Sequence, residues 1–227
     1  MPKTSTVSWC DITWNPVVGC RKVSPGCGNC TAEQSLNRLK GRKLSDYKYG
    51  FEPYEAQERL YLPFNWKKPQ IILVNSLSDL FLEEISLDYL NKVMLVMKDT
   101  PRHRYVISSK RMTHLACIAE QLHWPSNLVL GTSIESHDYL YRLDILKTLP
   151  PSLKFVSFQP LIGEVINPDV SGLGWVTCEA ESGLNARRVD FNWISHIKDA
   201  CMARNVPFVY NVNFIIEERM RKMIMAA

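Results

Sequence analysis

From about Gln70 onward, short apolar runs rich in β-branched residues alternate with longer amphipathic segments. The run "QIILVNS" (70–76) is compact and apolar and ends in polar residues, as a strand of a buried parallel sheet does. Comparable runs recur at residues 104–109, 127–136, 153–160, 174–183 and 207–213. An earlier run, "VSWCDITW" (7–14), predicts one more strand near the start of the chain.

The segments between these runs have the spacing of amphipathic helices. One apolar stripe, for example, is formed by Leu90, Val93, Met94 and Met97. Later segments carry equivalent stripes, with Met112, Leu115, Ala119 and Leu122, with Tyr139, Leu143 and Leu146, and with Trp193, Ile197, Ala200 and Cys201. Strands that alternate with helices predict an α/β fold with a parallel sheet of about six to seven strands.

Polar residues at the strand ends favour one of the two architectures that fit this count. An open doubly wound sheet uses only the strand ends near its switch point, whereas a barrel gathers all of them around one mouth. Nearly every predicted strand ends in polar residues: Asn75, Ser76, Ser78 and Asp79; Ser108, Ser109 and Lys110; Thr132, Ser133 and Glu135; Gln159; Glu179, Glu181 and Ser182; Asn211 and Asn213. The pattern therefore favours a partial TIM-type (β/α) barrel.

No linker, repeat or low-complexity segment divides the chain, so we expect residues 1–227 to form a single domain. Residues 41–68 are the least regular part and are expected to pack over the barrel. A basic amphipathic helical tail at residues 214–227 is expected to cover a barrel edge.

Composition narrows the class of protein. With 46% hydrophobic and 22% charged residues and a formal net charge of +4, the chain resembles an ordinary globular protein with a mild basic bias. No apolar run reaches the length of a signal peptide core or a membrane span, which predicts a cytoplasmic protein with no membrane partner. Seven cysteines in a reducing compartment argue against a complete disulfide framework.

The stretch "GCRKVSPGCGNC" (19–30) concentrates three of these cysteines in a polar loop, with the spacing C-x6-C-x2-C. Two cysteines separated by two residues can chelate one metal centre, and the neighbouring glycines allow the tight turn that this requires. A structural zinc site would need a fourth ligand, for which Cys10 is the candidate. A four-iron cluster with one open iron would need only Cys20, Cys27 and Cys30.

The position of this loop, after the first strand of a βα barrel and before a helix, resembles that of radical S-adenosylmethionine enzymes. That resemblance implies a 4Fe–4S cluster on Cys20, Cys27 and Cys30, with S-adenosyl-L-methionine bound at the open iron. It also implies an electron donor, and a 5′-deoxyadenosyl radical that abstracts a hydrogen atom from the substrate. The blocks "TWNPVVGCRKVSPGCGNCTAE", "VNSLSDLF", "FVSFQPLIG", "ESGLNARRVDFNW" and "VPFVY" are also similar to those of a phage-associated three-cysteine-motif family. They span nearly the whole chain.

The same resemblance points to residues of the barrel mouth. The candidates for binding the cofactor are Asn75, Ser76, Ser78, Asp79, Ser109, Lys110, Thr132, Ser133, Glu135 and Ser182. The candidates for catalysis are Glu135, Cys178, Glu179 and Glu181. The expected substrate is a small molecule or a nucleoside. The mild basicity and the phage association add nucleic acid as a further candidate partner.

Several positions depart from these patterns. The first cysteine gap is six rather than three, and Asn29 occupies the position of an aromatic residue. Phe158 and Gln159 replace a thiol and a carboxylate, residues 178–180 replace a glycine-rich run, and Asn211 replaces a lysine. Because the cluster cysteines are intact, we favour a changed substrate over lost catalysis. The alternative is a zinc-binding structural or interaction protein that uses Cys10, Cys20, Cys27 and Cys30.

Overall fold

The computed structural model describes residues 9–40, 49–183, 185–210 and 214–226. Their centre is a parallel sheet of seven strands, which confirms the predicted α/β class. The strands are β1 (Ile12–Trp14), β4 (Ile71–Val74), β5 (Arg104–Ser109), β6 (Leu128–Ser133), β7 (Leu153–Phe158), β8 (Trp175–Cys178) and β9 (Phe208–Tyr210). The strand expected at residues 7–14 is observed at Ile12–Trp14, and its first two predicted residues, 7 and 8, lie outside the described part.

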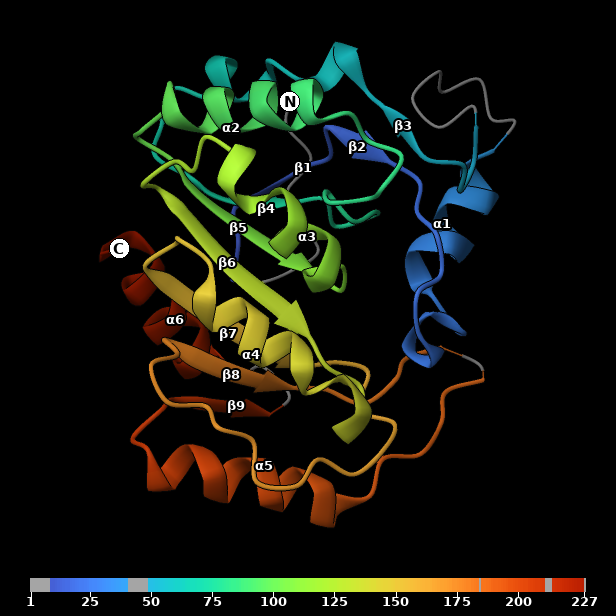
Figure 1. The fold of residues 1–227 in the computed structure, drawn as a ribbon, viewed down its shortest axis with the longest axis vertical. Helices are drawn as coiled ribbons and strands as arrows, with labels where there is room; N and C mark the ends of the chain where they lie inside the picture. Colours follow the sequence, from blue (N-terminus) through green and yellow to red (C-terminus); the bar gives the residue numbers. More distant parts are fainter. Residues whose placement is uncertain (1–8, 41–48, 184, 211–213, 227) are drawn as a thin grey trace.

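The order of the strands distinguishes the two candidate architectures. Each strand pairs with the next along the chain, from β1 at one edge to β9 at the other, and all six pairings are parallel. The order never reverses, so the sheet has no topological switch point of the kind that defines a doubly wound fold. The sheet curves as it passes from β1 to β9 (Figure 1). The predicted partial barrel is confirmed.

Helices cover the outer face of this sheet (Figure 1). They are α2 (Leu87–Lys98), α3 (Met112–Ile118), α4 (Tyr141–Thr148) and α5 (Phe191–Ala203), with the short 3-10 turns η5 (Ala119–Gln121) and η6 (His137–Tyr139) beside α3 and α4. Every second strand residue, such as Ile72, Ile107 and Leu130, joins the buried core beneath these helices. This alternation follows from the two-residue period of a strand and assigns the intervening residues to the inner face.

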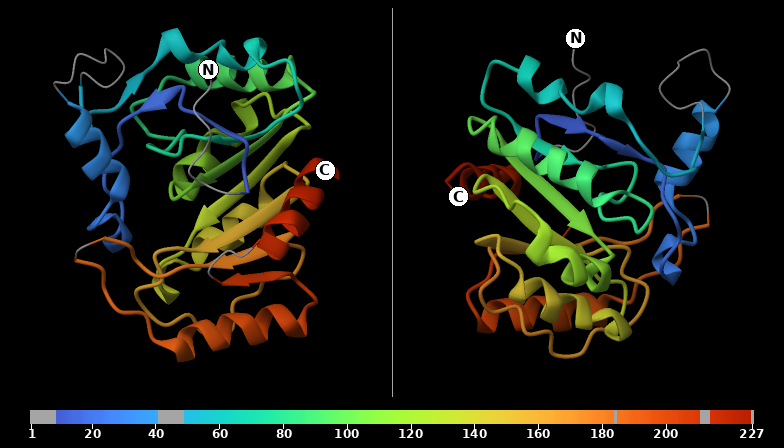
Figure 2. Two further views of the ribbon diagram at one scale, coloured as in Figure 1. Left: turned by 180° about the vertical axis from the view of Figure 1, so that it is seen from behind. Right: turned by 45° about the horizontal axis from the view of Figure 1, so that its top comes forward.

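A second apolar core closes the amino ends of the strands from the inner face. Strand residues including Ile71, Val106 and Val129 pack there with Met220 and Ile224 of α6 (Phe214–Ala226). Arg221 of the same helix pairs with Asp11, at 2.8 Å between Nη2 and Oδ1. Helix α6 thus lies on the face of the sheet opposite α5 (Figure 2) and seals the bottom of the barrel.

The described part of the irregular region packs beside the first strands. It contains β3 (Tyr54–Glu55), η3 (Gln57–Arg59) and η4 (Leu62–Asn65), whereas residues 41–48 lie outside the described part. Strand β3 pairs antiparallel with β2 (Val17–Val18). Arg102, just after α2, donates hydrogen bonds to the carbonyl oxygens of Trp66 (2.9 Å) and Pro63 (3.3 Å). No helix of the described residues has the length and apolarity needed to cross a membrane.

Candidate metal centre and cavity at the barrel mouth

The cysteine loop crosses the mouth of the barrel between β2 and α1 (Thr31–Leu39) (Figure 1). Its start depends on Gly19, whose φ is +80° and where a Cβ atom would lie 2.2 Å from the carbonyl oxygen of Glu52. No side chain fits there, so this glycine is a geometric requirement. The loop then forms the 3-10 turn η1 (Pro25–Cys27), and Cys30 occupies the N-cap position of α1.

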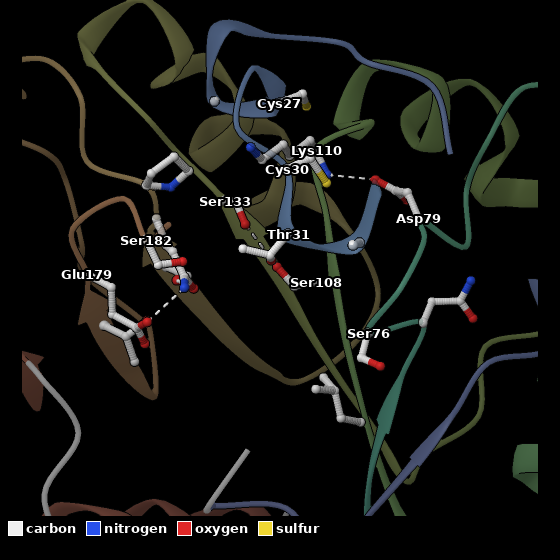
Figure 3. A pocket seen from close by; sticks show the side chains of 18 of the residues that line it. Cys27, Cys30, Thr31, Ser76, Asp79, Ser108, Lys110, Ser133, Glu179 and Ser182 are labelled. Carbon is white, nitrogen blue, oxygen red and sulfur yellow. Dashed lines mark hydrogen bonds between the residues drawn. The ribbon is translucent and has the colours of Figure 1, made fainter. Parts of the chain in front are cut away.

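A cavity of about 570 Å³ extends from this loop into the barrel. Cys20, Cys27 and Cys30 line it at the mouth, and Trp9 and Met220 line it at the closed end. Cys27 and Cys30 project into the space between Asp79 on one side and Glu179 on the other (Figure 3). The volume lies within the range of sites that bind small molecules or cofactors.

The side chains on the inner wall of the cavity form layers, because residues in register on neighbouring strands lie side by side. An aromatic layer comes first, because Gly131, Phe155 and Trp175 are paired across β6, β7 and β8. The Phe155 and Trp175 rings stack at 4.8 Å with an interplanar angle of 9°. Two residues further along, a hydroxyl layer is formed by Ser133, Ser157 and Thr177 in register, together with Ser108 on β5. Gln159 and Glu179 follow at the strand ends, and the Gln159 amide donates to the Glu179 carboxylate at 2.7 Å.

Most of the residues predicted from the sequence line this cavity. They are the three cysteines together with Asn75, Ser76, Ser78, Asp79, Lys110, Ser133, Glu179, Glu181 and Ser182. They come from the loop and from the carboxyl ends of β4, β5, β6 and β8, which a barrel brings to one mouth. The lining that the sequence did not single out as a site consists of Ser108, Ser157 and Thr177 of the hydroxyl layer and the aromatic floor below them.

Four of the predicted residues lie outside the lining. The side chains of Ser109 and Thr132 serve the sheet itself, since Ser109 donates to Asp79 (2.8 Å) and Thr132 donates to the Ser109 carbonyl oxygen (2.7 Å). Cys178 is buried in the core under the outer helices, and its burial raises the pKa of its thiol to about 12. The fourth is Glu135, buried beneath the cysteine loop. Successive side chains of a strand point to opposite faces of the sheet. Of two adjacent polar residues, only one can therefore reach the cavity.

The alternation of side chains along the strands also divides the positions that depart from the family pattern into core positions and cavity positions. Phe158 and Cys178 are both fully buried in the outer core, whereas Gln159, Glu179 and Ala180 line the cavity. Substitutions at the first two positions therefore act on packing, and those at the other three act on the cavity. Asn211 and Asn213 lie outside the described residues.

One wall of the cavity carries an unused hydrogen-bond acceptor. Asn75, which ends β4 with a φ of +57°, donates through Nδ2 to the Val17 carbonyl oxygen at 3.2 Å. Its Oδ1 atom is buried and accepts no hydrogen bond from the described residues. Asp79 nearby accepts from the Ser109 hydroxyl and from the backbone N–H groups of Phe81 and Lys110. An orphaned buried acceptor in a cavity wall is a feature that a ligand donor would satisfy.

The thiols of the loop are suitable ligands for a metal, but they do not converge on one point in this structure. Cys20, Cys27 and Cys30 form no disulfide, and all three line one cavity. Burial, reinforced by the charge of Asp79, raises the pKa of the Cys20 thiol to about 12. Among the described residues, no three side chains of His, Cys, Asp or Glu converge on one point. The ligand type of these three residues, and their position on one cavity, fit a three-thiolate metal site.

Cys10 lies at the other end of the barrel. It is buried at the amino end of β1, in the same apolar core as Ile71, Met220 and Ile224, and it is absent from the cavity lining. The three loop cysteines stand at the carboxyl ends of the strands. A zinc site that joins Cys10 to the loop would therefore have to span the barrel, and the structure does not favour it.

Glu135 fixes the cysteine loop to the barrel from below. Its carboxylate is fully buried and pairs with Lys110 and Arg142, each at 2.7 Å. The Ser24 hydroxyl of the loop donates to the same carboxylate. A Cβ atom at Gly26 would lie 2.3 Å from the Glu135 side chain, so the loop backbone rests directly on it. The residue thus holds the loop and is not among the residues that line the cavity.

Glu181 fixes the loop from the side. Its carboxylate accepts from Asn29 Nδ2 (2.9 Å) and from the Arg187 guanidinium and backbone N–H. Arg187 in turn donates to the carbonyl oxygen of Pro25 at 2.9 Å. Because Arg187 favours the ionised form, it lowers the pKa of the Glu181 carboxyl to about 2.

The Glu181 contact predicts a pH-dependent contribution to stability. The folded pKa is depressed from 4.5 to about 2, so the contribution is complete above pH 4.5 and is lost as the pH falls toward 2. We expect the difference in free energy of unfolding between wild type and Glu181→Gln to shrink over that interval, measured by urea unfolding. The exposed Glu120→Gln variant is the control. A difference that stays constant from pH 6 to pH 2 would contradict this assignment.

The fold and the loop together define a partial (β/α) barrel with a three-cysteine motif at its mouth. The chain belongs to the family described as "Protein of unknown function (DUF5131)", whose model matches residues 4–222. No curated protein sequence matches it.

Among solved structures, the fold is similar to that of spore photoproduct lyase. A cysteine-to-alanine variant of that protein, solved with a dinucleoside spore photoproduct, has a TM-score of 0.57 and 11% identity. A tyrosine-to-phenylalanine variant has a TM-score of 0.54 and 10% identity. Both alignments cover 93% of this chain and 79% of the other. At this identity the likeness establishes the fold.

Proposed function

We propose that the protein is a radical S-adenosylmethionine enzyme. Cys20, Cys27 and Cys30 would hold a 4Fe–4S cluster with one open iron, and S-adenosylmethionine would occupy the cavity beneath. The observation that carries the proposal is the set of three thiols at the mouth of a parallel partial barrel. No fourth cysteine of the described residues lines the cavity they face. When bound, such a cluster supplies the one-electron reduction that cleaves S-adenosylmethionine.

The lining suits a ligand with this charge. S-adenosylmethionine carries a sulfonium and an ammonium group against one carboxylate, so it is net positive. Asp79 and Glu179 make the described lining acidic, since Glu181 is paired with Arg187 and the one cationic side chain of the lining, Lys110, is paired with Glu135. The orphaned Asn75 Oδ1 offers an acceptor for an ammonium group on the wall next to Asp79. Asn75 and Asp79 would bind and orient the ammonium group of the cofactor.

The likeness to spore photoproduct lyase, a radical S-adenosylmethionine enzyme, supports the same class of chemistry for this fold. The dinucleoside bound in that structure adds support for a nucleoside or nucleic-acid substrate here. The reaction would also need a one-electron donor as a partner.

The proposal predicts that the reconstituted protein cleaves its cofactor. After anaerobic reconstitution with iron and sulfide, reduction with dithionite should convert S-adenosylmethionine to 5′-deoxyadenosine, detected by liquid chromatography and mass spectrometry. A triple Cys20, Cys27 and Cys30→Ala variant should yield only the background without protein. Fully iron-loaded wild-type protein that yields no 5′-deoxyadenosine would overturn the proposal.

A further inference from the structure

The three carboxylates that line the cavity differ in how far the protein satisfies them. Asp79 accepts from one hydroxyl and two backbone N–H groups, and Glu181 is neutralised by Arg187. Glu179 accepts one hydrogen bond, from the Gln159 amide, and among the described residues it forms no ion pair. Burial raises the pKa of the Glu179 carboxyl, and no cation in the described part of the chain opposes this shift. Glu179 therefore has acceptor capacity that the protein leaves unused.

Beside Glu179, the hydroxyl layer is also incompletely satisfied. Ser157 and Thr177 are each only 7% exposed, yet both line the cavity. The Ser157 hydroxyl lies 3.4 Å from Gln159 Oε1, which is a long contact, and Thr177 has no side-chain hydrogen bond to any described residue. Buried hydroxyls of this kind usually have partners. Each can donate to a ligand carbonyl oxygen.

Below the hydroxyls, the floor is aromatic and uncharged. The stacked Phe155 and Trp175 rings form it, and the buried indole N–H of Trp175 has no acceptor among the described residues. Lys110 is the one cationic side chain in the described lining, and Glu135 already neutralises it. A phosphate placed beside Glu179 would meet a carboxylate with no compensating cation among the described lining residues, which is unfavourable in a partly buried site.

We propose that the inner face of β7 and β8, formed by Ser157, Gln159, Thr177 and Glu179, is the substrate subsite and binds an uncharged nucleobase. The base would present an N–H group to Glu179 and carbonyl oxygens to the hydroxyls, as the imide edge of a pyrimidine does. Any phosphate of the substrate stays outside this subsite. The assignment rests on the proposed function, because it gives the substrate class of the same cavity.

Binding of thymidine and thymidine 5′-monophosphate to the full chain, measured by titration calorimetry, tests this subsite. Thymidine should bind, and its 5′-phosphate should weaken binding about tenfold or more. Glu179→Ala and Thr177→Val should each weaken thymidine binding, Glu179→Ala by about tenfold. Glu179→Gln, which preserves the shape of the side chain, should weaken it in the same direction. Glu120→Ala, an exposed carboxylate outside the cavity, should have no effect.

Equal affinity for the nucleoside and its monophosphate, or unchanged affinity in Glu179→Ala and Glu179→Gln, would overturn the assignment. Iron content and 5′-deoxyadenosine formation, measured on the same samples, separate it from the proposed function. Iron-loaded, cofactor-cleaving protein that fails to bind thymidine overturns the subsite alone. Protein that binds thymidine through Glu179 but takes up no iron supports the subsite and overturns the proposed function.

Discussion

Replacing Cys27 by alanine is expected to abolish stable cluster binding after anaerobic reconstitution. A four-iron cluster with one open iron already has one thiolate fewer than the common four-cysteine form, so the loss of another leaves too few ligands. Cys20→Ala and Cys30→Ala should have the same effect. The measurement is iron and acid-labile sulfide per chain, together with the thiolate charge-transfer absorption.

The matched control is Cys10→Ala. Cys10 is buried in the apolar core at the amino ends of the strands, away from the cavity, so its replacement should leave iron content unchanged. The Cys10→Ala substitution should lower the free energy of unfolding only through lost packing in that core. Loss of bound metal in Cys10→Ala, with stoichiometric zinc in the wild type, would instead support the four-thiolate zinc site.

Glu135→Ala is expected to produce the largest loss of stability among the variants considered. Glu135 and Arg142 are both fully buried, and two nitrogen atoms of Arg142, Nε and Nη2, already lack partners among the described residues. Removing the carboxylate leaves a buried cation uncompensated, which costs about 3–5 kcal/mol in comparable pairs. Urea unfolding of the two proteins measures this difference.

The same substitution should also release the cysteine loop. Without the carboxylate, the Ser24 hydroxyl loses its acceptor, and the thiols of the metal-free protein should react faster with iodoacetamide, followed by mass spectrometry. Glu218→Ala is the control, because its pair with Lys222 at 2.8 Å is exposed and screened by solvent, so its loss should change stability little. Unchanged stability and unchanged thiol reactivity in Glu135→Ala would refute its assignment as an anchor of the loop.

The fold could be predicted from the sequence because the apolar runs that form the strands recur regularly along the chain. The run "RYVISS" coincides with β5 at both ends, and the run predicted at residues 153–160 begins with β7 and extends two residues beyond its end at Phe158. The polar strand ends also pointed correctly to a barrel mouth. The location of the three cysteines at that mouth follows from their place after the first strand.

The direction in which each polar side chain points was harder to predict from the sequence. Ser108 and Ser109 are adjacent, yet Ser108 lines the cavity and Ser109 supports Asp79. Ser157 and Thr177 lie in stretches of β7 and β8 that are buried on both faces, so only the two-residue alternation could have assigned them to the inner face. The phase of that alternation is fixed by tertiary packing against the outer helices.

The anchors of the cysteine loop depend on contacts between distant parts of the chain. Ser24 meets Glu135 across 111 residues, and Asn29 meets Glu181 across 152. No local pattern in a single sequence records such pairs. This is why Glu135, predicted to bind the cofactor, lies instead beneath the loop that carries the cysteines.

Electron paramagnetic resonance of the reduced, reconstituted wild-type protein, with and without S-adenosylmethionine, tests the central claim most directly. A 4Fe–4S cluster held by Cys20, Cys27 and Cys30 should give a reduced-cluster signal, and S-adenosylmethionine should change its g values because the cofactor binds the open iron. A protein that takes up no iron, or a cluster signal that S-adenosylmethionine leaves unaltered, would contradict the account.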